Sequence, residues 1–189
     1  QNEYTALFEQ KKFHLINTTE YQSSGLWDQS TSHFGNLPEF SYAVDVDYRN
    51  DPGQRPNNDV ENLSVWTSTK FNLTPQDELM IQVVYSDYKS GDVSQYHTQA
   101  NGSKTQRVQE EQEPLSFLGY HRVWHPDSHT LFLSSYFDDT FERRDPNAII
   151  PLLDRDRSGK VTGVNPFTFD LNYQRRLKGF STELQQILK

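Results

Sequence analysis

Period-two alternation of apolar and polar residues is clearest in the stretch Leu63-Ser64-Val65-Trp66-Thr67-Ser68-Thr69-Lys70-Phe71-Asn72-Leu73-Thr74-Pro75-Gln76-Asp77-Glu78-Leu79-Met80-Ile81-Gln82-Val83-Val84-Tyr85. Successive side chains of a strand point to opposite faces, so this pattern predicts two long strands. Thr74-Pro75-Gln76-Asp77 supplies turn-forming residues between them. The stretch therefore predicts a β-hairpin with one apolar and one polar face.

Three further hairpins are expected along the chain. One spans 114–139 and turns at His125-Pro126-Asp127-Ser128, and another spans 167–189 and turns at Lys178-Gly179. The N-terminal hairpin pairs Tyr4–Gln10 with Phe13–Tyr21 around Lys11-Lys12. The sequence thus predicts a single all-β unit over 1–189, an antiparallel up-and-down meander of about eight long strands. Long loops are expected at about 22–60, 89–113 and 140–165.

The expected connections alternate between tight turns and long loops, which is typical of a transmembrane β-barrel. Strands of ten or more residues exceed the usual mean of about five to six but match the roughly 9 to 11 residues of a membrane-crossing strand. Only 33% of the residues are hydrophobic, whereas globular domains usually have about 45–50%. A wide barrel accounts for this shortfall, because one strand face meets lipid and the other meets water.

Under this interpretation the alternating residues divide into two sets. The lipid-facing set comprises Leu63, Val65, Phe71, Leu79, Ile81, Val83, Phe167, Phe169 and Leu171. The lumen-lining set comprises Asn62, Ser64, Trp66, Ser68, Lys70, Asn72, Thr168, Asp170 and Asn172. Aromatic residues near the expected strand ends fit interfacial girdles, among them Tyr88, Trp124 and Tyr136.

Charge and composition exclude several classes of function. A formal net charge of −8 argues against a nucleic-acid partner, which needs a basic surface. The absence of cysteine excludes disulfides, thiolate metal sites and a thiol nucleophile. No apolar stretch approaches the roughly 20 residues of a transmembrane helix. Membrane crossing, if it occurs, therefore has to use strands.

The hairpins at Phe71–Leu79 and Trp124–Leu131 resemble the periplasmic turns of Gram-negative outer-membrane β-barrels, both TonB-dependent receptors or porins and barrels attached to tetratricopeptide-repeat proteins. This resemblance implies a bacterial outer-membrane location, with the lipid bilayer as a partner. It also implies a pore, transport or receptor scaffold with long extracellular loops and an unidentified solute. An enzymatic role is not expected.

The expected topology departs from this family in one respect. It places both chain ends on the long-loop side, whereas complete barrels of this type have both ends on the short-turn side. The chain also ends in Leu188-Lys189 rather than in a terminal aromatic residue. We therefore expect an internal segment of a larger barrel, completed by further strands or by another subunit. An eight-stranded closed barrel is the weaker alternative.

Two weaker patterns suggest other functions. Asp154, Asp156 and Ser158, with Gly159 at the sixth position, have the spacing of a calcium loop, although Asn165 replaces the usual bidentate glutamate. Gly25-Leu26-Trp27 resembles the Gly-x-Trp of lipocalins. The alternative functional class is accordingly a soluble all-β protein that binds a small ligand or a partner. Weak Ca²⁺ binding is the one cofactor expectation.

An outer-membrane hydrolase is the low-probability enzymatic alternative. The adjacent carboxylates Asp138 and Asp139 stand at a strand end, and His33 and His97 lie in expected loops on the same side. Paired carboxylates with a histidine base are the groups that general acid–base catalysis uses. No established catalytic motif accompanies them, so this hypothesis rests on placement alone.

Overall fold

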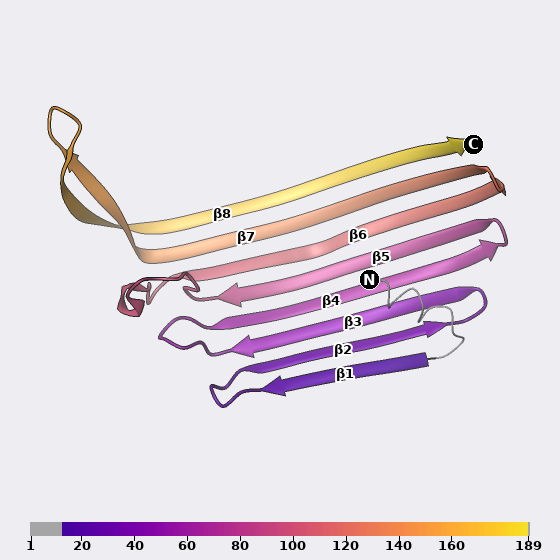
Figure 1. Ribbon diagram of the computed structural model, residues 1–189, viewed down its shortest axis with the longest axis horizontal. Coiled ribbons are helices and arrows are strands. Elements are labelled where there is room, and N and C mark those ends of the chain that lie inside the picture. Colours follow the sequence, from indigo (N-terminus) through magenta and orange to yellow (C-terminus); the bar gives the residue numbers. More distant parts are fainter. Residues whose placement is uncertain (1–12, 189) are drawn as a thin grey trace.

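The computed structural model describes residues 13–188, which form one sheet of eight strands (Figure 1). Their bounds are β1 (Phe13–Tyr21), β2 (Trp27–Asn36), β3 (Phe40–Asp51), β4 (Val60–Thr74), β5 (Asp77–Ser90), β6 (Arg107–His125), β7 (Ser128–Arg155) and β8 (Val161–Leu188). The one helical element among these residues is a 3₁₀ turn, Gln99–Asn101. The predicted all-β meander of eight long strands is confirmed.

Each strand pairs antiparallel with the next, in the order β1-β2-β3-β4-β5-β6-β7-β8. Over the described residues β1 pairs only with β2 and β8 only with β7, so the sheet is open. Each of these edge strands presents a row of unpaired backbone groups.

Tight turns lie at one end of the sheet, at 37–39, 75–76 and 126–127, and longer connections lie at the other end, at 22–26, 52–59 and 91–106. The predicted turns at Thr74–Asp77 and His125–Ser128 are confirmed. In the first of these, the Thr74 hydroxyl accepts hydrogen bonds from the backbone N–H groups of Gln76 and Asp77 and donates to the Asp77 carboxylate. Local side-chain bonding of this kind favours a turn over a continued strand.

The long loop expected over 22–60 is wrong, because this segment contains β2 and β3. In β3, Phe40, Tyr42, Val44, Val46 and Tyr48 alternate with a mainly polar set, Ser41, Ala43, Asp45, Asp47 and Arg49. Aspartate is depleted in strands, so Asp45 and Asp47 taken without their neighbours favour a loop. Their period-two placement puts both on one face of the strand and leaves the other face apolar.

The C-terminal third also differs from expectation. β7 and β8 each contain 28 residues and are joined at 156–160, so the long loop expected over 140–165 is instead a hairpin. Lys178 and Gly179 lie inside β8 and form no turn. Beyond Asp145 and Leu171 this hairpin projects past the rest of the sheet (Figure 1). Its tip depends on Gly159, whose φ of +85° is readily accessible to glycine.

Two further expectations concern the loop over 89–113 and the N-terminal strand. The loop expected over 89–113 is shorter, since β5 continues to Ser90 and β6 begins at Arg107. The expected strand Tyr4–Gln10 and its turn at Lys11-Lys12 lie outside the described residues.

Both ends of the described residues lie at the tight-turn end of the sheet, which at the C-terminal end contradicts the expected placement. Phe13 pairs with Gly35 beside the turn at 37–39, and Leu188 pairs with Ser128 beside the turn at 126–127. The C-terminal expectation failed because it divided β8 into two strands, whereas the N-terminal one depended on the strand Tyr4–Gln10, which lies outside the described residues.

The sheet forms a single layer with almost no dry core. Over the described residues, the buried hydrophobic side chains are Leu26, Phe34, Ala43 and Ala148. The accessible surface is 13298 Å², whereas a globular monomer of 22.1 kDa exposes about 9,300 Å². Many large apolar side chains, among them Leu15, Val83, Phe180 and Leu184, remain exposed. A second layer of some kind has to cover them.

We predict that the rest of the sheet does not depend on the projecting hairpin for its stability. Replacing residues 148–169 by one glycine should leave the melting temperature within about 4 °C of the parent, since a change of 1 kcal/mol shifts a protein of this size by about 2–4 °C. Thermal unfolding followed by circular dichroism measures the difference. A larger fall would show that this hairpin stabilises the main sheet.

Candidate functional site

One face of the sheet, here called the belt face, carries the side chains predicted to meet lipid. Strand register places Leu63, Val65 and Phe71 on the same face as Leu79, Ile81 and Val83. One row of directly paired residues then runs across six strands: Phe40, Phe71, Leu79, Tyr120, Phe132 and Leu184. The predicted grouping of these six belt residues from β4 and β5 is confirmed, and β3 and β6–β8 extend it.

On strands β3–β8 the belt face carries no Asp, Glu, Lys or Arg over three central rows, those of Thr67, Thr69 and Phe71. Toward the loops, Asp138 pairs with Lys178 in the next row, and Asp87 pairs with Leu63 in the row after that. Uncharged members of the belt face are Phe40, Tyr42, Val44, Val46, Tyr48, Leu63, Val65, Thr67, Thr69, Phe71, Leu79, Ile81, Val83, Tyr85, Ser116, Leu118, Tyr120, Phe132, Ser134, Tyr136, Phe180, Thr182 and Leu184. From Thr67 to Phe71 the three rows span about 14 Å at about 3.4 Å per residue, and on β5 the uncharged stretch from Leu79 to Tyr85 spans about 20 Å. Outer-membrane barrels have an apolar band about 25 Å tall.

Aromatic side chains lie at both margins of the belt. Phe40, Phe71, Tyr120 and Phe132 mark the margin near the tight turns, and Tyr21, Trp27, Tyr48 and Tyr85 mark the margin near the loops. Trp124 joins the first margin, where Arg122 stacks over its ring with the guanidinium carbon 4.1 Å from the ring centroid. Of the three expected girdle residues, Trp124 and Tyr136 lie on the belt face, and Tyr88 lies on the other face.

Charged pairs begin where the belt ends. Near the tight turns Arg122 pairs with Asp77 at 3.0 Å. Near the loops the Asp138 carboxylate accepts two hydrogen bonds from Arg176, at 2.9 and 3.0 Å, and lies 2.8 Å from the Lys178 ammonium. Such charge-assisted pairs can lie in a headgroup region, but an unpaired charge could not lie at low cost in hydrocarbon.

The expected carboxylate pair Asp138 and Asp139 does not form a site. Adjacent residues of a strand point to opposite faces, and each of these carboxylates pairs with a different β8 arginine, Asp138 with Arg176 and Asp139 with Arg175. His33, the expected base from a loop, lies within β2, where its Nδ1 is 3.1 Å from the Tyr42 hydroxyl. These contacts fix the strands in register.

The opposite face of the sheet has two different halves. Over β2–β5 it is polar and acidic and carries Asp28, Ser30, Ser32, Asp45, Asp47, Asn62, Ser64, Ser68, Lys70, Gln82 and Ser86. Over β6–β8 it carries Leu115, Phe117, Leu131, Leu133, Phe137, Leu177 and Ile187. The predicted lumen-lining residues Asn62, Ser64, Trp66, Ser68, Lys70 and Asn72 therefore share one face.

Two hollows open on the opposite face. One of about 440 Å³ lies against β5–β8 and is lined in part by Glu78, His121, Leu131 and Gln185. The other, of about 290 Å³, is lined by Asp47, Ser64, Trp66, Val84, Ser86 and Gln112. Trp66 is 51% exposed there, which is unusual for a large aromatic residue on an otherwise hydrophilic surface.

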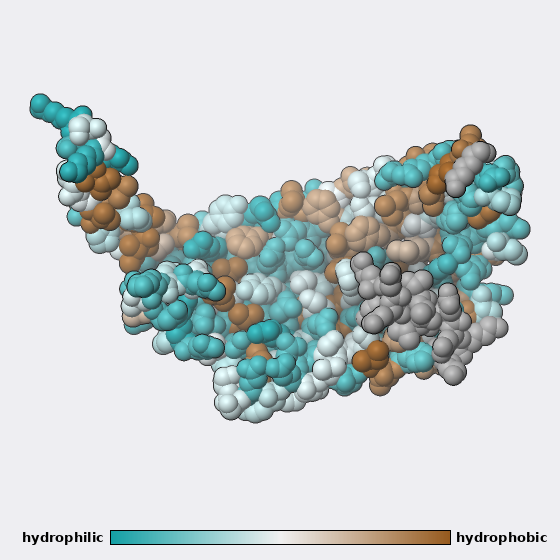
Figure 2. Space-filling model, viewed as in Figure 1, coloured by the Kyte–Doolittle hydropathy of each residue, from teal (hydrophilic) through white to brown (hydrophobic). Residues whose placement is uncertain are grey.

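The remaining expected site residues lie away from the central belt. Phe167 and Phe169, whose rings stack at 6.5 Å between centroids, belong to the projecting hairpin together with Thr168. Leu171 pairs with Asp145 at the base of this hairpin, next to a register shift, and Asp170 and Asn172 flank it. Along β8, Leu171 is in phase with Leu177 on the opposite face and Asn172 is in phase with Leu184 of the belt, so the faces predicted for Leu171 and Asn172 are reversed. Figure 2 shows apolar colour on the stem of the projection and hydrophilic colour at its tip. Sequence alternation could not reveal that this strand extends past its neighbours.

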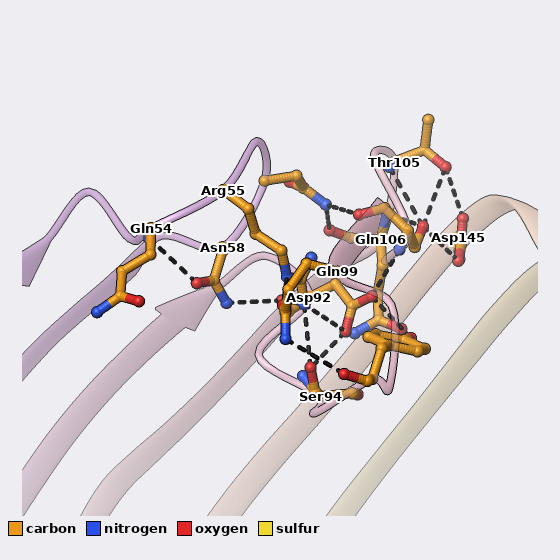
Figure 3. A network of polar contacts seen from close by, with 12 residues as sticks. Gln54, Arg55, Asn58, Asp92, Ser94, Gln99, Thr105, Gln106 and Asp145 are labelled. Carbon is orange, nitrogen blue, oxygen red and sulfur yellow. Dashed lines mark hydrogen bonds and ion pairs between the residues drawn. The ribbon is translucent and has the colours of Figure 1, made fainter. Parts of the chain in front are cut away.

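The loops 52–59 and 91–106 are joined by a dense polar network centred on the fully buried Asp92 (Figure 3). Its carboxylate accepts hydrogen bonds from the backbone N–H groups of Ser94 and Ser103 and from the Tyr96 hydroxyl, at 3.0, 2.6 and 2.8 Å. The Arg55 guanidinium lies 3.7 Å from the same carboxylate and donates to the Asp92 backbone carbonyl. The network holds both loops in one arrangement.

Asn57 forms the other centre of this loop network. Its side-chain amide donates to the backbone carbonyls of Ser103 and Gln106, and its backbone carbonyl accepts from the Asp92 N–H. The loops approach so closely that a Cβ added at Gly91 would lie 2.2 Å from the Asn57 carbonyl oxygen. Glycine is therefore required at position 91 by space.

Asp145 extends the network to the base of the projecting hairpin. Its carboxylate accepts hydrogen bonds from the hydroxyls of Ser103 and Thr105, at 2.9 and 2.7 Å. The long loop, the β3–β4 loop and the β7–β8 hairpin are thus connected by polar contacts at one end of the sheet. Sequence analysis missed this network, because its partners lie up to about fifty residues apart.

Burial and hydrogen bonding act in opposite directions on the pKa of Asp92. Burial raises this pKa by disfavouring the carboxylate, while hydrogen bonds from Ser103, Tyr96 and Ser94 lower it. The hydrogen bonds dominate, so the pKa of Asp92 lies below its ordinary value. The folded loops consequently favour the ionised form.

The expected calcium residues form the tip of the projecting hairpin. Asp156 accepts hydrogen bonds from the Ser158 N–H and hydroxyl and from the Lys160 N–H, while Asp154 accepts from the Asn165 side chain. Hydrogen bonding from Ser158 is the largest cause that holds the pKa of Asp156 below its ordinary value. Calcium binding at Asp154, Asp156 and Ser158 stays a prediction.

Within residues 13–188, no group of three or more His, Cys, Asp or Glu side chains is arranged to hold a metal ion. In the same part of the chain, no helix has the length and apolar character needed to cross a membrane. Comparisons with protein-family models, curated proteins and solved structures find no match to this chain.

We predict that Asp92→Asn loosens the loops without unfolding the sheet. The amide cannot accept all the hydrogen bonds that converge on the carboxylate, and leaving buried donors unsatisfied costs about 1–3 kcal/mol. Limited proteolysis should therefore cut within 91–106 faster, while circular dichroism of the strands stays unchanged. Asp127→Asn, at an exposed tight turn, is the matched control. Equal protease resistance of the parent and Asp92→Asn would contradict the assigned role.

Acid should have the same effect as this substitution. The pKa of Asp92 is lower in the folded than in the unfolded chain, so its stabilising contribution is present above the ordinary aspartate pKa of about 3.9 and is lost as pH falls through the folded value. Amide hydrogen exchange in 91–106 should accelerate below about pH 4 relative to its expected intrinsic pH dependence. Asp92→Asn should remove most of this additional acceleration, and its persistence there would assign the effect to another group.

Proposed function

We propose that this chain is part of a bacterial outer-membrane β-barrel, which forms a pore, transport or receptor scaffold. The belt face contacts lipid, the opposite face lines an aqueous lumen, and the loops 22–26, 52–59 and 91–106 face outward. The tight turns at 37–39, 75–76 and 126–127 then face the periplasm. No catalytic role is included in this proposal.

The charge-free centre of the belt face carries the proposal. A single-layer sheet that exposes large apolar side chains needs a covering layer, and lipid supplies one along the entire belt at once. The aromatic margins of the belt resemble those of outer-membrane barrels, and its uncharged stretch of about 20 Å on β5 approaches their apolar band of about 25 Å. Thr and Ser within the belt are compatible with this role, because uncharged hydroxyl groups cost far less in a bilayer than ions do.

The open edges of the sheet also need a partner in a membrane. Unpaired N–H and C=O groups are costly in hydrocarbon, so barrels in membranes are closed. The outer edges of β1 and β8 therefore need pairing, either with further strands of a larger barrel or with another subunit. Closure of β1 directly onto β8 is the alternative for a small barrel.

The polar half of the opposite face suits a water-filled lumen. Asp28, Asp45 and Asp47 give this wall an excess of negative charge, with Arg49 as a nearby cation. Acidic walls favour cations over anions in aqueous pores. The apolar half over β6–β8 suits contact with a plug segment or an inward-folded loop. The identity of the solute stays open.

The packed loops support a recognition role on the outward side. A network that fixes 52–59 against 91–106 presents a defined surface, and ordering loops before binding lowers the entropic cost of binding. The projecting hairpin adds an apolar surface beyond the proposed membrane. Both features fit a receptor or an assembly partner better than a simple diffusion channel.

A soluble all-β binding protein is the second candidate, and one observation favours it. The apolar half of the opposite face, with Leu133 43% exposed and Leu177 48% exposed, could be covered by an apolar ligand or a second protein layer. In that case the belt face would also require a protein cover. Lipid dependence separates the two candidates.

We predict that Val83→Arg is costly only in a membrane. Val83 lies at mid-height of the belt, where an arginine on the lipid face of a barrel costs about 2–4 kcal/mol. Gln82→Arg places the same charge at the adjacent residue, on the opposite face of the sheet. It should change the free energy of unfolding by less than about 0.5 kcal/mol. Urea unfolding of protein folded into phospholipid vesicles measures both values.

Two outcomes would contradict the membrane proposal. One is an equal cost for the two variants in vesicles. The other is a cooperatively folded chain in detergent-free buffer, with β-structure and unfolding free energies unchanged by lipid. Either result would favour the soluble candidate.

A further inference from the structure

Two histidines meet on the opposite face near the tight-turn end of the sheet. His121 of β6 and His129 of β7 are diagonal neighbours across the strand pair, with Nε2 of the first 3.1 Å from Nδ1 of the second. Their rings are stacked with centroids 5.3 Å apart. One nitrogen of each ring therefore points toward the other ring.

The other nitrogen of each ring has its own partner. Nε2 of His129 lies 3.0 Å from the Pro126 carbonyl oxygen, which can only accept a hydrogen bond. Nδ1 of His121 lies 3.6 Å from a Glu78 carboxylate oxygen, and the second oxygen of Glu78 lies 2.8 Å from the Lys70 ammonium. Metal-ligating histidines usually have this arrangement, with the distal ring nitrogen donating to a carbonyl or a carboxylate.

The protonation pattern follows from these partners. Neutral His129 carries its proton on Nε2 and presents a lone pair at Nδ1. His121 presents a second lone pair at Nε2 when its proton moves to Nδ1, beside the Glu78 carboxylate. This tautomer change needs no net gain or loss of a proton. It leaves two unprotonated nitrogens 3.1 Å apart, each of which can act as a metal ligand.

We infer that His121 and His129 form a two-imidazole site for a divalent transition-metal cation, held in orientation by Glu78 and the Pro126 carbonyl. A cation about 2.1 Å from both nitrogens would see them about 95° apart, close to the cis angle of tetragonal and octahedral complexes. Imidazole ligands suit Cu²⁺, Ni²⁺ and Zn²⁺, and Cu²⁺ binds most tightly among these.

The surroundings leave room for further ligands. The hollow of about 440 Å³ beside His121 is also lined by Glu183 and Gln185, whose strand β8 flanks β7. Water or the donor atoms of an incoming molecule would complete the coordination sphere there. Lys70 is the nearby cation, and its pairing with Glu78 keeps its charge compensated. This site does not depend on the membrane proposal.

Titration of tag-free protein with Cu²⁺ alone tests the site, with calorimetry for affinity and electron paramagnetic resonance for the number of coordinating nitrogens. The parent should bind one Cu²⁺ through two imidazole nitrogens. His121→Gln and His129→Gln should each weaken binding by about tenfold or more and leave one nitrogen. His125→Gln, at the same end of β6, should change neither value.

Glu78→Gln tests the orienting contact separately. Loss of an outer-shell partner typically lowers metal affinity by about 10- to 100-fold, and both nitrogens should still be detected. Because protons compete for the same nitrogens, affinity in the parent should also fall on acidification. Circular dichroism of each variant confirms that the sheet is intact.

The inference is overturned if the parent binds no stoichiometric Cu²⁺. It is also overturned if His125→Gln weakens binding as much as the paired variants do, or if His121→Gln and His129→Gln leave both the affinity and the nitrogen count unchanged. The nitrogen count in the parent is independent of any substitution, so a variant that fails to fold leaves the test valid.

Discussion

A single sheet layer with no second layer of its own is the constraint on which the rest of this structure depends. Burial of apolar surface contributes about 25 cal/mol per Å², and this chain leaves an unusually large part of its apolar surface uncovered. Backbone pairing along eight strands satisfies hydrogen bonds but does not remove those side chains from water. The molecule therefore reaches its stable state only when another phase or another protein covers the belt face.

Several features become understandable together under this constraint. The belt face excludes ions over its three central rows, and ion pairs such as Asp77 with Arg122 and Asp138 with Arg176 begin at its margins. The polar network of Asp92 and Asn57 stabilises the long loops without a hydrophobic core beneath them. Loop order is thus supplied by hydrogen bonds in the region where apolar burial is scarce.

Sequence alternation was sufficient for the central hairpin, since β4 and β5 have strict periodicity and a turn with clear local chemistry. It failed at β3, which was assigned to the long loop over 22–60, although Val44 and Val46 alternate there with Asp45 and Asp47. It failed again at Lys178-Gly179, because turn-forming residues were read without the register of the partner strand. Strand length beyond neighbouring strands, as in the β7–β8 projection, depends on pairing that no local pattern encodes.

The candidate sites also differ in whether a local sequence pattern predicts them. The belt and the polar set of β4 followed from period-two spacing, because a strand assigns faces locally. The Asp92 network and the His121–His129 pair did not, because each joins residues from separate strands or loops whose proximity depends on the register of the whole sheet. Asp138 and Asp139 show the converse case: neighbours in sequence that the strand places on opposite faces.

The central claim is that the belt face meets lipid while the opposite face meets water, and site-directed spin labelling tests it directly. The chain has no cysteine, so single cysteines from 62 to 72 on β4 can be labelled in vesicles without background. Collision with oxygen should peak at the odd positions, while collision with a water-soluble nickel chelate should peak at the even positions. Equal access of the nickel chelate to both sets would contradict the account.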